Sequence, residues 1–376
     1  MRQSTSRAIA TITTLAFLFL PLPAVAASKS AAQTQYAVVS LGVLDNAGSS
    51  TVLRRTNSRG EVVGGYRQGG RSETAGAFLL SSTGILFLTD QQKTDYSAAY
   101  GINDSGEIAG TMNGANSTLP FRSVRHDQFQ LLSLLAGDTA GAAYGINKNG
   151  EAVGFTSGSN GIHAVWWTRT GQVTQLPTLA NGGTVKAVAI NAKGDIAGNA
   201  GNGETTAVRW PGKGGAIQLG NLAGFSSSRA ESLNSSGDIV GASTDLEAFA
   251  TRMHATLWPA STTNPQDLGV LLGGTNSRAR DVDDNDWVVG TGDSSQGNRA
   301  FLWSSSTGML DLNTLSTNPA LILVDALSID KNGVILAIGI DVKDAPPMQA
   351  MGTMVATQHV EERELPRHIV LLTPVK

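Results

Sequence analysis

The chain of 376 residues contains no cysteine. This absence excludes disulfide bonds, a lipoprotein anchor, thiolate metal sites and cysteine nucleophiles. Charged residues make up only 15% and aromatic residues only 6% of the sequence, whereas glycine occurs 44 times. Beyond the N-terminal segment, no apolar run is long enough to span a membrane. The composition is typical of a turn-rich, all-β repeat protein.

The N-terminal segment has the pattern of a signal peptide. Arg2 and Arg7 precede the apolar run Ala8–Leu20, and the small residues Ala24 and Ala26 follow it. The run is short for an uncleaved anchor, so we expect cleavage after residue 26. Loss of the two arginines takes the formal charge from −3 to −5, which argues against nucleic acid as a partner. The pattern predicts a soluble exported protein without a membrane anchor, periplasmic or extracellular.

One phrase recurs seven times and organises the chain. It appears as TNSRGEVVG, INDSGEIAG, INKNGEAVG, INAKGDIAG, LNSSGDIVG, VDDNDWVVG and IDKNGVILA, which end at Gly64, Gly110, Gly154, Gly198, Gly241, Gly290 and Ala337. An Asn or Asp at the second position of each phrase opens the turn, and a glycine usually follows three residues later. These residues favour a tight turn, and Asp286, which replaces the glycine in the sixth copy, tolerates a positive φ angle. Each phrase therefore predicts a strand, a hairpin turn and a second strand.

The repeat spacing predicts a closed β-propeller. The turn residues lie 43 to 49 residues apart, and about four strands fit in each unit. The third strand is a second recurrent phrase, and its fourth position is tryptophan in four copies: Trp167, Trp210, Trp258 and Trp303. The seventh unit ends after its third strand. We expect residues 35–41 to supply the missing outer strand and to close a seven-bladed ring of four-stranded antiparallel blades, rather than an open β-solenoid.

These features imply a simple domain organisation. Residues 1–26 are the expected signal peptide and residues 27–34 a short linker. Residues 35–376 form the single propeller, with one long loop at residues 341–367.

The repeats resemble the HAF repeats of exported bacterial proteins. The resemblance is carried by SRARDVDDNDWVVG, RAFLWSSSTGMLDL and HAVWW, and it extends over nearly all of the chain from Tyr36 to Pro374. That family is defined by its repeat and not by a reaction. The resemblance therefore implies an exported propeller and transfers no catalytic residue.

Two positions of the first strand in each unit differ most between repeats. Five residues before the turn residue, and again two residues later, units four to seven place charged side chains near the expected mouth of a central channel: Lys186, Arg229, Glu231, Arg278, Arg280 and Asp325. Clustered arginine and lysine suit a carboxylate or sulfate group. The alternative is that these charges neutralise one another in an interblade ion-pair network.

Other chemistries have weaker support. His163, His254 and His368 occupy one repeat position and are interpreted as structural caps, and His126 is isolated. No zinc-protease or nucleophile-elbow motif is present. Glu231 and Asp325 form the one carboxylate pair that could serve a glycosidase, and the paired tyrosines Tyr100 and Tyr144 could serve a lyase as bases or could belong to the core.

Two stretches of the sequence resemble metal-binding sites. The run from Asp281 to Asn285 resembles a calcium loop, but Asp286 and Gly292 stand where such a loop needs glycine and glutamate. The long loop contains Met348, Met351, Met354 and His359, which could hold Cu(I) or form one apolar helix face. The second interpretation is favoured, so no metal and no cofactor are predicted.

The sequence thus predicts a monomeric, exported propeller that acts by binding a glycan or a protein partner. The alternative is a carbohydrate-active enzyme, a polysaccharide lyase or a glycoside hydrolase, with its site on the face where the first strands begin.

Overall fold

The structure is a computed structural model. It describes residues 34–43, 49–68, 75–88, 96–114, 117–125, 128–180, 182–201, 205–247, 250–344 and 367–375. The chain separates into residues 1–33 and residues 34–376. The predicted signal peptide, nearly all of the linker, His126 and residues 345–366 of the long loop, with its three methionines and His359, lie outside the described residues. None of the described helices is both long and apolar enough to cross a membrane.

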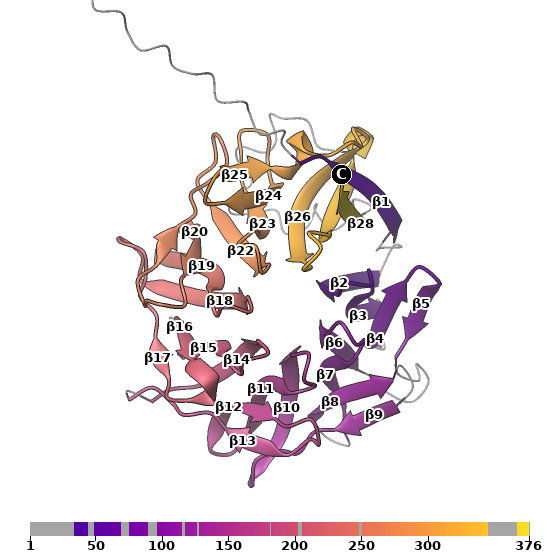
Figure 1. The fold of residues 1–376 in the computed structure, drawn as a ribbon. Coiled ribbons are helices and arrows are strands. Elements are labelled where there is room, and N and C mark those ends of the chain that lie inside the picture. The colour runs from indigo at the N-terminus through magenta and orange to yellow at the C-terminus, as the bar shows by residue number, and fades with distance from the viewer. Residues whose placement is uncertain are drawn as a thin grey trace, which may run out of the picture. The chain divides into compact units, whose positions relative to one another are not determined.

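The fold is a seven-bladed β-propeller (Figure 1). Blade one comprises β2 (Ser49–Thr56), β3 (Val62–Gln68), β4 (Ala75–Ser81) and β5 (Gly84–Phe87). Blade two comprises β6 (Ser97–Ile102), β7 (Ile108–Asn113), β8 (Thr118–Arg125) and β9 (Gln128–Leu131). Blade three comprises β10 (Asp138–Ile146), β11 (Ala152–Gly158), β12 (Gly161–Trp167) and β13 (Val173–Gln175). Blades four and five comprise β14 (Val185–Ile190), β15 (Ile196–Ala200), β16 (Thr206–Trp210), β17 (Ile217–Gln218); and β18 (Ser227–Leu233), β19 (Ile239–Glu247), β20 (Ala250–Trp258), β21 (Gln266–Asp267).

Blade six comprises β22 (Ser277–Val282), β23 (Val288–Gly292), β24 (Arg299–Ser304) and β25 (Gly308–Asp311). Blade seven takes β26 (Leu321–Ile329), β27 (Ile335–Asp341) and β28 (Arg367–Pro374) from the end of the chain and β1 (Tyr36–Val43) from its beginning. Three short 3-10 turns, η1 (Pro211–Lys213), η2 (Leu312–Thr314) and η3 (Val342–Asp344), complete the described elements.

The predicted closure of the ring is confirmed. The strand β1 pairs antiparallel with β28, from Tyr36 opposite Pro374 to Val43 opposite His368. Tyr36 is buried, and its backbone N–H donates to the carbonyl of Leu315 at 2.8 Å. Figure 1 places β1 on the outside of blade seven, beside β28. The N-terminal strand therefore covers an edge that would otherwise be open for pairing.

The hydrophobic core lies between neighbouring blades. One cluster, for example, joins Val153 and Ala164 of blade three to Val185 and Trp210 of blade four. Three of the recurrent tryptophans also connect blades by donating Nε1–H to a backbone carbonyl, Trp167 to Ser133, Trp210 to Pro177 and Trp258 to Gly220, at 2.7 to 2.8 Å. This explains why the position recurs in the sequence.

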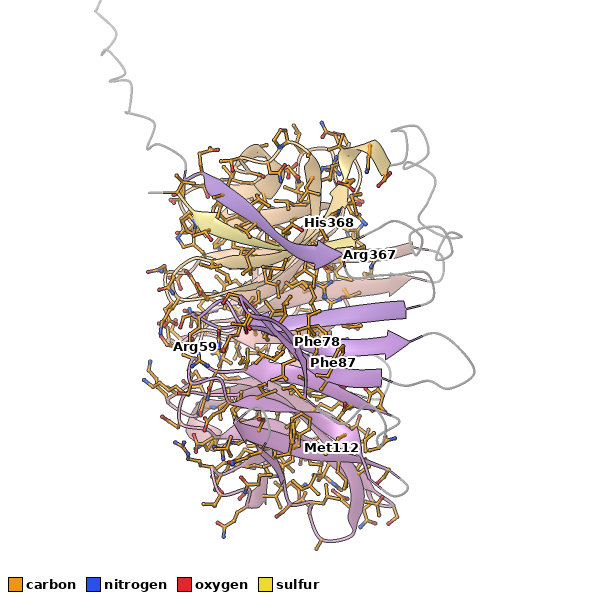
Figure 2. All side chains as sticks on the ribbon, turned by 90° about the vertical axis from the view of Figure 1, so that its right-hand side faces the viewer. Arg59, Phe78, Phe87, Met112, Arg367 and His368 are labelled. Carbon is orange, nitrogen blue, oxygen red and sulfur yellow. The ribbon has the colours of Figure 1, made fainter. Side chains whose placement is uncertain are left out.

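The recurrent turn also connects one blade to the next. In blade two, the Asn103 side-chain oxygen accepts from the backbone N–H groups of Ser105 and Glu107, each at 3.0 Å. Its Nδ2 donates to the Glu107 carboxylate at 2.7 Å and to the carbonyl of Asn147 in the next blade at 2.9 Å. Equivalent interblade bonds run from Asn57, Asn147 and Asn191. Figure 2 shows Arg59, which belongs to the first turn, on this face of the ring, called the turn face below.

Candidate functional site

A β-bulge interrupts the innermost strand of every blade. In each blade the register shift nearest the turn leaves one residue without a partner on the second strand, and these residues are Arg54, Tyr100, Tyr144, Val188, Glu231, Arg280 and Leu327. A bulge redirects side chains and is common beside functional sites. The bulged residues form one of the two variable series that the sequence singled out. The face on which the innermost strands begin is called the strand-start face below.

Five of the six predicted site residues meet in three ion pairs, two of which cross from one blade to the next. Arg278 of blade six pairs with Glu231 of blade five, and Arg229 Nε lies 2.9 Å from the same Glu231 oxygen. Arg280 reaches across to blade seven, where it donates to the two carboxylate oxygens of Asp325 at 3.3 and 2.7 Å. The structure therefore contains an interblade ion-pair network of the kind that the sequence left open as the alternative to a binding site.

The sixth predicted residue, Lys186, lies apart from these ion pairs. Its Nζ sits over the ring of Phe155, 4.7 Å from the ring centre. A cation–π contact of this kind leaves the charge uncompensated. The six residues thus set four cations against two carboxylates, and the side chain of Arg229 is 57% exposed. The cluster retains positive charge that faces solvent.

Burial acts on the ionisation of the paired groups. It raises the pKa of the Asp325 carboxyl, and the charge and hydrogen bonds of Arg280 oppose this rise. Burial also lowers the pKa of Arg278, against the opposing effect of Glu231. The two interblade ion pairs, whose side chains are partly buried, link blades five to seven.

The two candidate tyrosine bases are held as neutral phenols. The Tyr100 hydroxyl lies 3.2 Å from the Tyr96 hydroxyl, and the rings of Tyr100 and Tyr144 meet edge to face at 5.0 Å. Burial raises the pKa of both phenols. Because a lyase base must lose its proton near neutral pH, this environment disfavours that role.

Sequence reasoning missed a connection across the centre of the ring. Arg55 of blade one forms an ion pair with the buried Asp281 of blade six, and its Nη2 donates to the carbonyl of Glu231 at 3.1 Å. Asp281 also accepts from Ser232 at 2.5 Å and Ser328 at 2.9 Å. Side chains from blades one, five, six and seven therefore join beneath the strand-start cluster.

The sequence did contain a signal for this connection. Arg55 and Asp281 occupy one repeat position, two residues before the turn residue. The other five copies are small: Gly101, Gly145, Ala189, Ser232 and Ser328. Because the only two charged residues in a series of small ones have opposite charges, they are expected to pair with each other.

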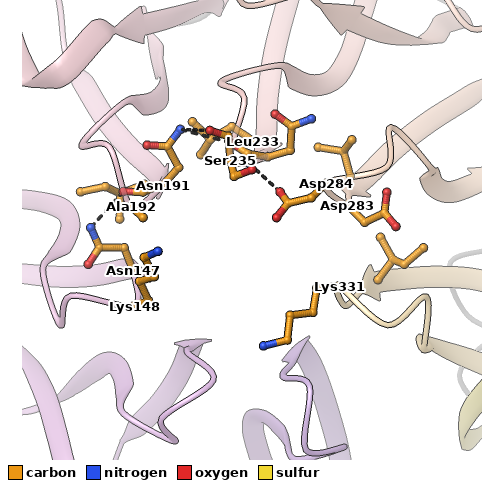
Figure 3. Close-up of a pocket in the computed structure, with 13 residues that line it drawn as sticks. Asn147, Lys148, Asn191, Ala192, Leu233, Ser235, Asp283, Asp284 and Lys331 are labelled. Carbon is orange, nitrogen blue, oxygen red and sulfur yellow. Dashed lines mark hydrogen bonds between the residues drawn. The ribbon is translucent and has the colours of Figure 1, made fainter.

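A pocket of about 250 Å³ opens on the turn face (Figure 3). Its lining includes Lys148, Lys331, Asp283 and Asp284. Lys331 Nζ pairs with Asp104 at 2.6 Å, and Asp284 accepts from the backbone N–H of Ser235 at 2.8 Å. Both groups therefore have a structural role in the contacts between turns.

The recurrent histidines occupy three separate blades, and each meets an aspartate. The nitrogen–oxygen distances are 3.0 Å for His163 and Asp138, 2.8 Å for His254 and Asp267, and 3.3 Å for His368 and Asp341. Figure 2 labels His368 beside Arg367 at the start of β28. Within the described part of the chain, no three His, Asp or Glu side chains are grouped so that they could hold a metal ion.

Comparison with known proteins supports the fold. No family model matches the chain, and no curated protein matches it. Among solved structures, virginiamycin B lyase from Staphylococcus aureus is 12% identical, with a TM-score of 0.53, and the match covers 91% of this chain and 100% of that one. The β-propeller domain of the Trilobed protease from Pyrococcus furiosus is 10% identical, with a TM-score of 0.51 and coverage of 80% and 92%.

A third match is partial. TolB from Acinetobacter baumannii is 13% identical, with a TM-score of 0.45, and the match covers 65% of this chain and 61% of that one. The first two matches, with TM-scores of 0.53 and 0.51, support a shared propeller architecture and nothing finer, because one fold accommodates many unrelated functions.

Proposed function

We propose that the protein is an exported binding module that takes an acidic glycan at the strand-start face of the propeller. The observation that supports this most directly is the charge of that face. Three arginines, Arg229, Arg278 and Arg280, share two carboxylates, and Arg229 extends into solvent. Lys186 adds a fourth positive charge, which lies over Phe155. Guanidinium groups suit carboxylate and sulfate groups because their donors form a planar fork.

The N-terminal pattern supports export, and the repeat phrases support membership of the HAF-repeat proteins. We therefore place the protein in the periplasm or outside the cell, as a monomer, where an acidic cell-surface or extracellular glycan is accessible. An acidic segment of a protein partner would meet the same cations, and the experiment below distinguishes it from a glycan.

The arrangement favours binding over catalysis. A glycosidase needs two of its own carboxyl groups free to face the glycosidic bond of the sugar. Here both oxygens of Asp325 accept from Arg280, and one Glu231 oxygen is shared by Arg229 and Arg278. The carboxylates of Asp325 and Glu231 are therefore suited to positioning the arginines and not to attacking a sugar.

Replacement of Arg229 by alanine tests the proposal. Glu231 keeps Arg278 as a partner, so the fold should be retained, while affinity for oligogalacturonate should fall about tenfold or more, as expected for loss of a charge-assisted contact. Titration calorimetry measures the affinity, and thermal unfolding measures the stability. The matched control is Lys148→Ala, which removes one exposed positive charge on the opposite face.

The proposal fails if Arg229→Ala lowers the melting temperature while binding stays unchanged, since that result assigns the arginine to the fold. Binding of an acidic peptide in place of the oligosaccharide would replace the glycan with a protein partner.

A further inference from the structure

Next to Lys186 lies a continuous arc of aromatic rings. Phe155 packs against Tyr144 at 5.6 Å between ring centres, Tyr144 against Tyr100 at 5.0 Å, and Tyr100 meets the Tyr96 hydroxyl at 3.2 Å. The arc runs from blade three to blade two, on the side of the ring opposite Glu231 and Arg280. Its members have no place in the ion-pair network.

A cation lies at each end of this arc. Lys186 sits over Phe155, and Arg54 sits over Tyr100, with its guanidinium carbon 5.3 Å from the ring centre. No described carboxylate pairs with either cation. The aromatic rings therefore position two charges without neutralising them.

The Tyr144 hydroxyl belongs to the ring that meets Tyr100, over which Arg54 sits. The positive charges of Arg54 and Arg229 both act to lower its pKa, while burial has the larger effect and raises it. The group therefore stays a phenol and keeps a proton to donate. Among the residues that the structure describes, none forms a hydrogen bond with this hydroxyl.

We propose that the acidic group of the ligand is bound beside Arg54, where it accepts a hydrogen bond from the Tyr144 hydroxyl. This inference rests on the proposed function and specifies its ligand as a uronate-bearing sugar. The carboxylate meets the guanidinium fork of Arg54 and one phenol, and the aromatic arc offers apolar surface to the carbon–hydrogen face of the pyranose ring. Arg278 and Arg280, whose donors are used by carboxylates of the protein, then orient the site and do not contact the ligand.

Two conservative variants test this assignment. Tyr144→Phe removes one oxygen atom and leaves the arc intact, and Arg54→Gln removes the charge over Tyr100. Each variant should weaken binding of trigalacturonate about tenfold or more, as loss of a hydrogen bond to a charged group predicts. Titration calorimetry on the purified protein gives the affinity, and thermal unfolding verifies that the variants are folded.

Two controls accompany the variants. Lys148→Gln removes one charge on the turn face and should leave the affinity unchanged. The fully methyl-esterified trisaccharide has the same sugar rings without charge and should not bind measurably.

The possible failures are distinguishable. If Arg229→Ala weakens binding while Tyr144→Phe and Arg54→Gln behave like Lys148→Gln, the assignment of Tyr144 and Arg54 is wrong and the proposed function stands. If the unmodified protein binds neither trigalacturonate nor longer acidic oligosaccharides, the proposed function fails, and this inference fails with it.

Discussion

At the scale of single residues, the first position of the recurrent turn and the position four residues later depend on each other. Five turns begin with asparagine and have Glu61, Glu107, Glu151, Asp195 or Asp238 at the later position. The two turns that begin with Asp283 and Asp330 have Trp287 and Val334 there. The reason is chemical, because an asparagine amide donates to the acid, whereas two carboxylates at this distance would repel.

Asp330 differs from the asparagines of this set in the hydrogen bonds that its side chain makes. Its Oδ1 accepts from the backbone N–H groups of Asn332 and Val334 at 2.8 and 2.9 Å. Its Oδ2 is buried without a hydrogen-bond partner among the described residues. In the asparagine turns, the corresponding Nδ2 donates to the next blade. Burial accordingly raises the pKa of Asp330 from its ordinary value of 3.8.

Asp330→Asn should therefore stabilise the protein at neutral pH. A raised pKa in the folded state means that the wild-type carboxyl favours folding below pH 3.8 and costs stability once the pH rises through the folded-state value. The asparagine removes this cost and restores an interblade donor, so we expect a gain of about 1 kcal/mol at pH 7 that is much smaller at pH 3.5. Urea unfolding at the two pH values measures it.

The converse change provides the control. Asn103→Asp places a second carboxylate beside Glu107, where the amide now donates at 2.7 Å, and should destabilise the protein at pH 7. If Asp330→Asn lowers stability at pH 7, the interpretation of the buried oxygen is wrong.

At the scale of the element, the bulge explains the glycine that ends the recurrent phrase. A Cβ on Gly64, Gly110, Gly154, Gly198, Gly241 or Gly290 would collide with a backbone carbonyl of the innermost strand. The seventh copy has Ala337 instead, opposite β26, whose register shifts a second time between Leu323 and Asp325. The glycine thus serves a close approach of two strands, whereas Gly106 and Gly150 serve positive φ angles in the turns.

Gly154→Ala should destabilise blade three, because the methyl group has no space beside the carbonyl of Ala142. Overpacking of this kind costs roughly 1–3 kcal/mol. Gly76→Ala is the matched control, since among the described residues a Cβ there meets Phe87 alone, at 3.9 Å. Figure 2 labels Phe87 beside Phe78. Chemical denaturation compares the two variants. Equal stability of both would show that the strands can move apart at the bulge.

At the scale of the whole molecule, the repeat made the fold predictable. The period, the turn residues and the incomplete last unit specified seven blades and the pairing of the N-terminal strand, and the structure confirms both. The positive φ angle of Asp286, which is 63°, was also predicted correctly. Local chemistry was sufficient here because each blade repeats the same contacts.

The candidate site was only partly predictable. The variable positions on the innermost strands identified the cationic cluster, since they stand out by comparison between repeats. The link from Arg55 to Asp281 had a signal in the repeat comparison, but its geometry joins blades one and six, which are distant in sequence. The aromatic arc joins neighbouring blades, and the ring contacts depend on bulges that the sequence does not display.

The central claim is that the strand-start face binds an acidic glycan without altering it. A glycan-array screen of the purified protein, with mass spectrometry of every bound glycan, tests this most directly. We expect the bound glycans to be uronate-rich or sulfated and to be recovered intact, with binding that weakens as salt concentration rises. Binding confined to neutral glycans, or recovery of cleaved or unsaturated products, would contradict the account.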